Sequence, residues 1–346
     1  MRKILYCFIL PLMAFFATLL VSCERTLEFQ GQFNSGIAIS CLAQPGEPFY
    51  LTVSKSFNIN TNPTRVFSTD GEVYYREIDT LYDEEIVIKN AKAEITVNGT
   101  DHYSLVYTGI SSVLHQPIPF SYTCDYVPKV GDEIEVRVSA PGYDDVHATT
   151  KVLDPQTIEV VNKEVVYKEN EYDGTGIYDD PYERFGLDSV MNITMRIHDP
   201  KGERNYYRLK VRGVADRYSY TGTWRHDYWT MTDVFYTDDV LLRDNMLAKP
   251  FGDWKAGVTN VFDDHLIDGR DYTFTVESRM MKGDNPRVIV ELQTIPAEMY
   301  YFFKSYLQIR IATSDSYTSP VGLYSNVENG WGIFGSLSYD RHTVYY

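Results

Sequence analysis

Apolar and polar residues alternate in short runs along most of the chain, which is the pattern of β-strands with one buried face. Between residues 36 and 154 the runs are rich in Val, Ile, Thr and Tyr and are separated by turn dipeptides such as Asn98-Gly99 and Pro141-Gly142. The clearest runs are GIAISCLA, EPFYLTVSKSF, AKAEITVNG, HYSLVY, DEIEVRVSAPG and DVHATTKVL. Strands of this number and spacing predict an immunoglobulin-like β-sandwich over residues 36–154.

Residues 58–89 interrupt the first half with an acidic, tyrosine-bearing insertion, which we expect to form an exposed loop or an extra hairpin. The segment KVLDP, Lys151 to Pro155, then marks a domain boundary, and strand-like runs continue beyond it. These later runs are TIEVVNKEVVY, SVMNITMRIHDP, NYYRLKVRGV, DYTFTVESR and RVIVELQTI. The residues from 155 to 346 therefore predict a second, mainly β domain.

One segment near the end of the chain has helical spacing instead. In PAEMYYFFKSYLQIRIA, Pro296 is suited to the start of a helix. The apolar residues that we expect to face the core are Met299, Phe302, Phe303, Tyr306 and Ile309. The chain is thus expected to be all-β, with one short helix near the C-terminus. In the tail that follows, we expect the glycines to mark close backbone approach and Trp331, Ile333 and Phe334 to anchor the end in the core.

The first residues of the chain predict a membrane attachment. Arg2 and Lys3 precede an apolar run, Ile4 to Val21, whose length suits both a signal peptide and a short membrane span. The run ends in Leu20-Val21-Ser22-Cys23, which resembles the lipobox of bacterial lipoproteins. We therefore predict a lipoprotein signal peptide over residues 1–22, lipidation of Cys23 and a polar tether over residues 23–35. The alternative is an uncleaved N-terminal anchor, and either arrangement holds the body of the protein at a membrane.

Charge excludes one class of partner. The formal net charge is −16, and it becomes −18 once the signal peptide removes Arg2 and Lys3. A nucleic-acid binder needs a basic surface that displaces counterions from phosphates, so no nucleic-acid partner is expected. The body keeps two cysteines, Cys41 and Cys124, both in strand-like runs. Export permits a bridge between them, but buried free cysteine is common in strands and we expect free thiols.

No complete motif for catalysis or cofactor binding is found. The seven histidines are scattered, and the chain contains no HExxH, GxSxG or Walker loop. Gly330, Gly332 and Gly335 in the tail have the spacing GxGxxG, but they lie in a strand-like run and not at the turn from a strand to a helix that a dinucleotide site needs. The acidic run Asp173 to Asp180 has oxygen ligands that suit calcium, but its spacing is not that of an EF-hand and a solvated loop is the better interpretation. We therefore predict no metal, no cofactor and no enzymatic activity. A hydrolase whose catalytic carboxylates come from distant positions stays open as an alternative.

One stretch has the character of a binding surface. In RYSYTGTWRHDYWTMTDVFYTDD, four aromatic residues share one parity and would lie on one side of an extended chain. They are Tyr218, Tyr220, Trp224 and Tyr228. Amphipathic rings give a large contact area at low entropy cost, which suits a sugar, a peptide or a partner protein. The alternative is that these tyrosines simply cover a sheet, since the chain carries 29 of them.

Four features in chain order resemble a known family. They are the lipobox cysteine; the run SAPGYDDVHATTKVLDP; the segment IHDPKGERNYYRLKV followed by FDDHLIDGRDYTFTV; and the tail YTSPVGLYSNVENGWGIFGSLS. Together they span most of the mature chain and are similar to the Bacteroidetes lipoprotein family of domain of unknown function 4249. The resemblance implies an exported outer-membrane lipoprotein, often encoded beside a TonB-dependent receptor, and it implies no settled activity.

We therefore expect an outer-membrane protein, held by its N-terminal lipid, that acts as a non-catalytic binding or accessory subunit of a TonB-dependent uptake complex. The TonB-dependent receptor as partner rests on the resemblance alone. The ligand, whether sugar, peptide or another nutrient, is left open, as is the face of the outer membrane, cell surface or periplasmic. The alternatives are a structural or adhesive surface protein, a periplasm-facing assembly factor and the hydrolase named above.

Overall fold

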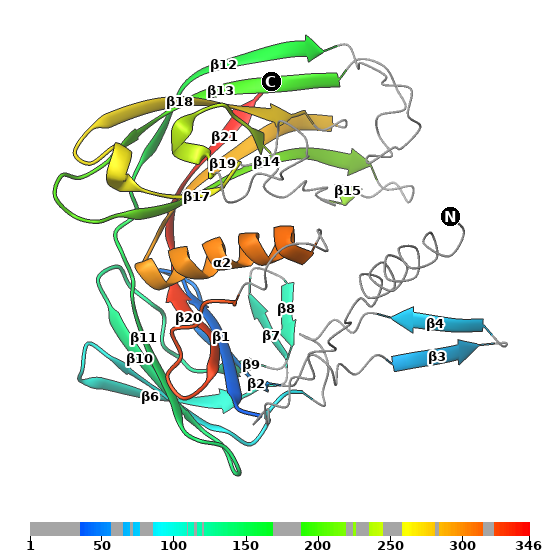
Figure 1. Cartoon of the computed structure of the whole chain (residues 1–346), viewed down its shortest axis with the longest axis vertical. Coiled ribbons are helices and arrows are strands. Elements are labelled where there is room, and N and C mark those ends of the chain that lie inside the picture. The colour runs from blue at the N-terminus through cyan, green and yellow to red at the C-terminus, as the bar shows by residue number, and fades with distance from the viewer. Residues whose placement is uncertain are drawn as a thin grey trace, which may run out of the picture. The chain divides into compact units, whose positions relative to one another are not determined.

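The alternating runs form strands in the computed structural model. The structure describes residues 35–56, 65–69, 72–76, 86–108, 110–113, 116–119, 121–168, 188–218, 224–225, 235–244, 258–280, 284–313 and 322–346. The prediction of an all-β chain with one helix near the C-terminus is confirmed over these ranges (Figure 1). No helix in them combines the length and the apolar character that a membrane crossing needs.

The first sheet has eight strands in the order β11-β10-β5-β6-β9-β2-β1-β20. Their bounds are β1 Ile37–Ala43, β2 Tyr50–Lys55, β5 Lys92–Val97, β6 Asp101–Tyr107, β9 Ser121–Thr123, β10 Glu133–Ser139, β11 Val146–Lys151 and β20 Trp331–Ser336. Alternate residues of these strands are buried in one core, as in β1, where Ile37, Ile39 and Cys41 point inward. The Asn98-Gly99 turn joins β5 to β6 with φ of 53° and 72°, which are the positive values that a tight hairpin turn requires.

The last strand of this sheet comes from the far end of the chain. β20 lies parallel to β1, and Gly332 is the register partner of Ile39. Gly332 has φ of +102°, and a Cβ atom there would lie 2.0 Å from the carbonyl oxygen of Ile39, so only glycine fits. This close approach confirms the interpretation of the tail glycines. Ile333 and Phe334 are buried as predicted, but Trp331 is 52% exposed, so its predicted core position is wrong.

β20 also connects the two edges of the eight-stranded sheet. The Oγ of Ser336 donates to the carbonyl oxygen of Lys151 on β11 (2.6 Å). Next to β20, the Nδ2 of Asn326 donates to the carbonyl oxygens of Phe334 (2.7 Å) and of Thr149 on β11 (3.3 Å). The sheet therefore curls around its core until its edges meet. The finer prediction of an immunoglobulin-like sandwich is not confirmed by this topology.

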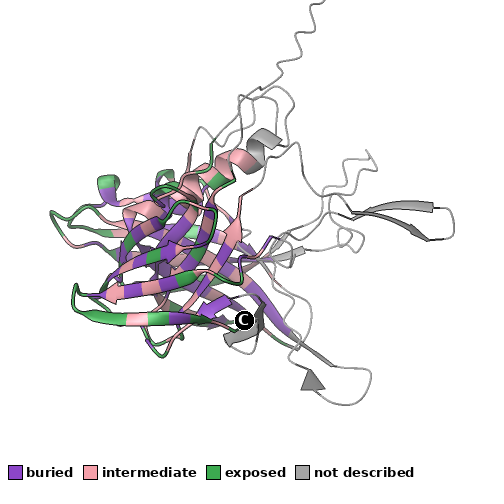
Figure 2. Cartoon of the chain, turned by 90° about the horizontal axis from the view of Figure 1, so that it is seen from below, coloured by how far each residue is buried: buried purple, intermediate pink, exposed green. Residues whose placement is uncertain are grey.

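Two further sheets pack their apolar faces on a second core. One has the order β12-β13-β18-β16, and the other has the order β15-β14-β19-β21 with β17 beside β14. Their bounds are β12 Ile158–Lys168, β13 Asp188–His198, β14 Tyr206–Tyr218, β15 Trp224–Arg225, β16 Phe235–Tyr236, β17 Val261–Asp263, β18 Asp271–Arg279, β19 Asp284–Ile295 and β21 Ser338–Tyr345. Figure 2 shows the buried positions in the strands and many of the exposed ones in their connections.

The smaller elements complete the list. Two hairpins pair β3 Arg65–Thr69 with β4 Glu72–Arg76, and β7 Ile110–Val113 with β8 Gln116–Pro119. The first hairpin lies in the acidic insertion, where an extra hairpin was one of the two expectations. The short 3-10 helices are η3 Val240–Leu242 and η5 Asp264–Leu266.

The predicted helix is α2, Ala297–Thr313. Met299 is buried in a third apolar cluster, and Phe302 and Phe303 pack partly against it. Tyr306 is 47% exposed, so its predicted core position is wrong; Tyr300 is buried in its place. Residues Ser35–Tyr346 form one compact unit, in which β20 belongs to the first sheet. The domain boundary at residues 154–155 stays a prediction.

Candidate functional site

The residues singled out from the sequence are only partly described. Cys23, Tyr220 and Tyr228 lie outside the described residues. Tyr218 ends β14 and Trp224 begins β15, and the two are register partners in an antiparallel pair. The described ends of this part of the stretch therefore lie side by side. A binding role for these four residues stays a prediction.

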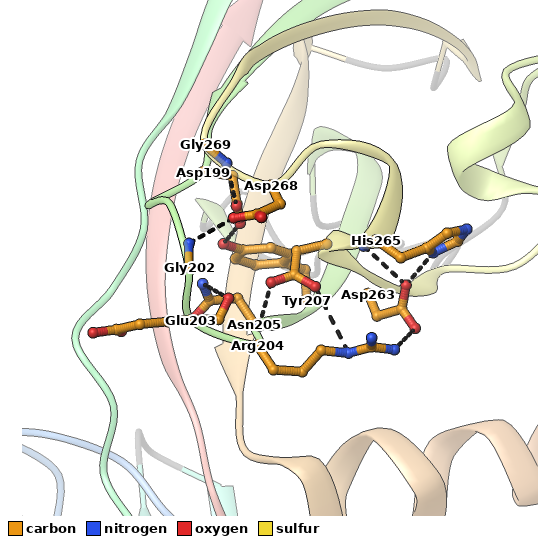
Figure 3. Close-up of polar contacts among 11 residues, drawn as sticks. Asp199, Gly202, Glu203, Arg204, Asn205, Tyr207, Asp263, His265, Asp268 and Gly269 are labelled. Carbon is orange, nitrogen blue, oxygen red and sulfur yellow. Dashed lines mark hydrogen bonds and ion pairs between the residues drawn. The ribbon is translucent and has the colours of Figure 1, made fainter.

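Two segments that carry the family resemblance meet at one end of β14, as Figure 3 shows. They are the connection after β13, residues 199–205, and the segment at the end of β17, residues 263–270. We call the hydrogen-bonded contact between them the clasp. Asp199 is 1% exposed and accepts hydrogen bonds from the hydroxyl of Tyr207 (2.5 Å) and from the backbone N–H of Gly269 (3.2 Å).

Two more aspartates of the clasp bind backbone groups. Asp264, which is 3% exposed, accepts from the backbone N–H of Asn205 (2.6 Å). Asp268 accepts from the backbone N–H of Gly202 (2.7 Å). In each pair a carboxylate from one connection accepts a hydrogen bond from an N–H group of the other. The bond from Asn205 is partly buried, where an N–H group needs such an acceptor, and the bond from Gly202 is exposed. These aspartates therefore fix the two connections to each other.

The protonation states in the clasp agree with this positioning role. Burial raises the pKa of Asp199, and the hydrogen bond from Tyr207 opposes that effect without reversing it. Burial and the same carboxylate raise the pKa of Tyr207 well above its ordinary value, so the phenol stays protonated and donates. Among the described residues, no group of three or more His, Cys, Asp or Glu is arranged to hold a metal ion.

Arg204 connects the clasp to an aromatic surface. Its Nη2 lies 2.7 Å from Oδ2 of Asp263, and its guanidinium carbon lies 5.8 Å from the ring centre of Tyr206. Asp263 also accepts from the ring and the backbone N–H of His265. Burial acts to raise the pKa of Asp263, but the bonds from His265 and the charge of Arg204 outweigh it, and the pKa lies below its ordinary value. Asp263 is thus a charged anchor for Arg204.

The aromatic surface consists of four tyrosines, which we call the tyrosine cluster. They come from β14, from α2 and from the segment before β20; they are Tyr206, Tyr300, Tyr301 and Tyr324. Ring centres are 4.8 Å apart for Tyr206 and Tyr300, and 5.6 Å apart for Tyr301 and Tyr324. Tyr301 is 47% exposed, as is the neighbouring Leu323. The cluster therefore presents aromatic surface to solvent from positions held by a strand and a helix.

The chemistry of the tyrosine cluster is that of recognition. Burial raises the pKa of Tyr300 and of Tyr324, so both hydroxyls stay neutral and can donate and accept hydrogen bonds. The Nζ of Lys304 lies 5.6 Å from the ring centre of Tyr300 and 3.4 Å from a carboxylate oxygen of Asp244. Ring faces beside hydroxyls and flanking cations suit a partner that offers both apolar and polar groups.

Sequence reasoning missed the tyrosine cluster and the clasp. The tyrosine pair in NYYRLKV and the one in PAEMYYFFKSY are visible in the sequence, but no period relates them to each other or to Tyr324. Only the tertiary structure brings the three segments together.

Fold and site thus define an all-β protein with a tyrosine-lined surface. The chain belongs to the family described as Domain of unknown function (DUF4249), whose family model matches residues 24–343. No curated protein and no solved structure is similar to it at a significant level.

Proposed function

We propose that the protein is a Bacteroidetes outer-membrane lipoprotein, anchored through lipidated Cys23, that acts as a non-catalytic binding or accessory subunit of a TonB-dependent uptake complex. The lipobox Leu20 to Cys23 supports the anchor, and so does the family match, which begins at Glu24, directly after the cysteine. The described chain from Ser35 onward is then a β-rich body on a short polar tether.

The observation that carries the binding role is the tyrosine cluster. Tyr301 exposes nearly half of its surface although the rings beside it are packed, so the exposed face is held in one orientation before any partner arrives. A surface that is ordered in advance loses little conformational entropy on binding. Tyrosine is also among the residue types that contribute most to binding in protein interfaces.

The test is purification of the native protein from its own membrane in a mild detergent, with identification of the proteins that accompany it. We expect a transporter of the TonB-dependent class to co-purify. Replacing Tyr301 and Tyr324 together by alanine should reduce the recovered partner at least tenfold, because each ring contributes stacking and buried area. Tyr306→Ala is the matched control, since Tyr306 is on the same helix and is also 47% exposed but lies outside the tyrosine cluster.

Other outcomes would replace the proposal. Recovery of fibres of this chain alone would favour the structural or adhesive alternative. An unchanged partner yield in the double variant, or equal losses in the control, would remove the tyrosine cluster from the interface.

The anchor is tested separately. Cys23→Ala should release the protein from the outer membrane fraction, because the acyl chains contribute about 0.8 kcal/mol per buried methylene and no other anchor is proposed. Membrane retention of this variant, together with a negative lipid-labelling result for the native protein, would overturn the lipoprotein assignment.

A further inference from the structure

A cavity of about 640 Å³ lies along the β16 edge of the sheet that contains β13 and β18. One wall consists of Asn192 on β13 with Thr273, Thr275 and Glu277 on β18, and apolar residues that belong to or pack on the second core line the cavity as well; they are Val258, Phe274 and Val276. The other wall is the segment Tyr236–Asp239, which leaves β16, together with Arg243 after η3. Its volume is within the range of about 300–1,000 Å³ that is typical of small-ligand sites. None of the four clustered tyrosines lines it.

The second wall belongs to the aromatic stretch that the sequence singled out. Residues Phe235 to Asp239 are the last part of RYSYTGTWRHDYWTMTDVFYTDD, and Phe235 and Tyr236 form β16 against β18. The end of that stretch therefore forms one side of a cavity.

Hydrogen bonds hold the two walls in a fixed relation. The Oγ1 of Thr237 donates to the carbonyl oxygen of Thr275 (2.7 Å). The hydroxyl of Tyr272 donates to Oδ1 of Asp239 (2.9 Å), and the same oxygen accepts from the backbone N–H of Leu241 at the start of η3. The cavity is thus formed before a ligand arrives, which lowers the entropy cost of binding.

The lining favours a neutral ligand that is rich in hydroxyl groups. Among the described residues that line the cavity, three carry a carboxylate and one carries a guanidinium; the carboxylates are those of Asp238, Asp239 and Glu277. The guanidinium is that of Arg243, which pairs with Asp238 (3.1 Å). This excess of negative charge disfavours phosphates, sulfates and acidic sugars. Carboxylates accept strong hydrogen bonds from hydroxyls. Within the described chain, no protein group bonds to the side chains of Asn192 and Thr273, so an amide and a hydroxyl are available to a ligand.

We propose that this cavity binds a neutral carbohydrate. The ring of Tyr236 supplies an aromatic wall, and the amide, hydroxyl and carboxylate groups supply the donors and acceptors that a polyhydroxylated ligand needs. The assignment goes beyond the anchor and the transporter proposed above, and it is tested without either.

The experiment uses the full chain purified in a detergent without a sugar head group. Calorimetric titrations with maltoheptaose, cellohexaose, xylohexaose and mannohexaose should find at least one that binds with a sub-millimolar dissociation constant. Hydrogen exchange should slow in residues 235–239 and 271–278 on addition of that sugar. Asn192→Ala and Thr273→Val should each weaken binding about tenfold, because each removes a hydrogen-bonding group from the ligand.

Asn162→Ala is the matched control, because Asn162 is exposed on β12 of the same sheet and does not line the cavity. It should leave binding unchanged, and all variants should keep the native melting temperature. Absence of binding by every neutral oligosaccharide at millimolar concentration would overturn the proposal. Binding of spermidine or of polygalacturonate in the cavity instead, or equal weakening by Asn162→Ala, would overturn it as well. Failure here leaves the co-purification test of the uptake complex unaffected.

Discussion

Gly332→Ala tests whether β20 completes the first sheet. At Gly332 the chain has φ of +102°, and a Cβ atom would lie 2.0 Å from the carbonyl oxygen of Ile39 and 3.0 Å from its carbon. These are backbone atoms of the neighbouring strand, so no side chain can move aside to make room. We expect the substitution to force β20 away from β1.

The magnitude follows from two contributions. A non-glycine residue in the left-handed region costs about 1–2 kcal/mol. Relief of the 2.0 Å contact requires a shift of more than about 1 Å, which takes adjacent hydrogen bonds out of their range of about 2.7–3.2 Å. If two interstrand hydrogen bonds are lost, each loss leaves a buried polar group unpaired and costs about 1 kcal/mol or more. The expected loss in unfolding free energy is therefore about 3–5 kcal/mol.

Gly142→Ala separates the two contributions. Gly142 has φ of +86°, but a Cβ atom there would meet nothing within 4 Å, so only the backbone cost of about 1–2 kcal/mol applies. Urea unfolding of both variants, read out by the fluorescence of the tryptophans, gives the two free energies under the same conditions. If Gly332→Ala costs no more than Gly142→Ala, β20 is not packed against β1 as described.

Three other predictions concern separate parts of the chain. Glu291 is 3% exposed and accepts hydrogen bonds from the Nε (2.8 Å) and Nη2 (2.6 Å) of Arg341. Burial acts to raise the pKa of Glu291, but hydrogen bonds from Gln293 and Arg341 bring this pKa below the ordinary 4.5. Because hydrogen bonds to a charged group contribute about 1.5–3 kcal/mol, Glu291→Gln should cost about 2 kcal/mol of unfolding free energy at pH 7. In urea unfolding, the difference in unfolding free energy between the variant and the native protein should shrink below pH 4.5 as Glu291 becomes protonated, and a difference that is constant with pH would contradict this. Cys41 and Cys124 should both react with a thiol reagent in denatured, non-reduced protein. The reason is that β2 separates β1 from β9 and puts the two Cα atoms about 9–10 Å apart, beyond the limit of about 7 Å for a bridge. Failure of both thiols to react would disprove the prediction of free thiols. Replacing Tyr220, Trp224 and Tyr228 of the aromatic stretch together by alanine should weaken partner binding at least tenfold and leave the melting temperature unchanged. A large fall in the melting temperature would instead assign these residues to the core.

The sequence allowed the local elements of the fold to be predicted because their signals are local. IAISCLA alternates with period two and is β1, and the Asn98-Gly99 dipeptide has the backbone angles of its hairpin turn. The helix after Pro296 also follows from spacing. The residues that face the core follow in part, since Met299, Phe302 and Phe303 pack on it as predicted. Because α2 also packs against strands on more than one side, Tyr300 is buried and Tyr306 is left exposed.

Long-range arrangements could not be predicted in this way. Nothing in WGIFGS indicates parallel pairing with β1, and Trp331 is exposed because it stands at the start of β20, where the buried positions begin only two residues later. The clasp depends on loop carboxylates that meet loop N–H groups from about 60 positions away, and such pairs have no period. The tyrosine cluster likewise exists only once three distant segments have packed.

Pairing of β1 with β20 also sets the order in which the protein can be completed during synthesis. Translation makes β1 among the first strands of the body and β20 near the end, so the exposed edge of β1 waits unpaired while the strands from β12 to β19 and the helix α2 are made. Unpaired edges attract strands from other chains, and contacts between distant segments form slowly. Closure of the first core is therefore a late event, and a truncated product that lacks β20 keeps an open, aggregation-prone edge that quality-control proteases can recognise.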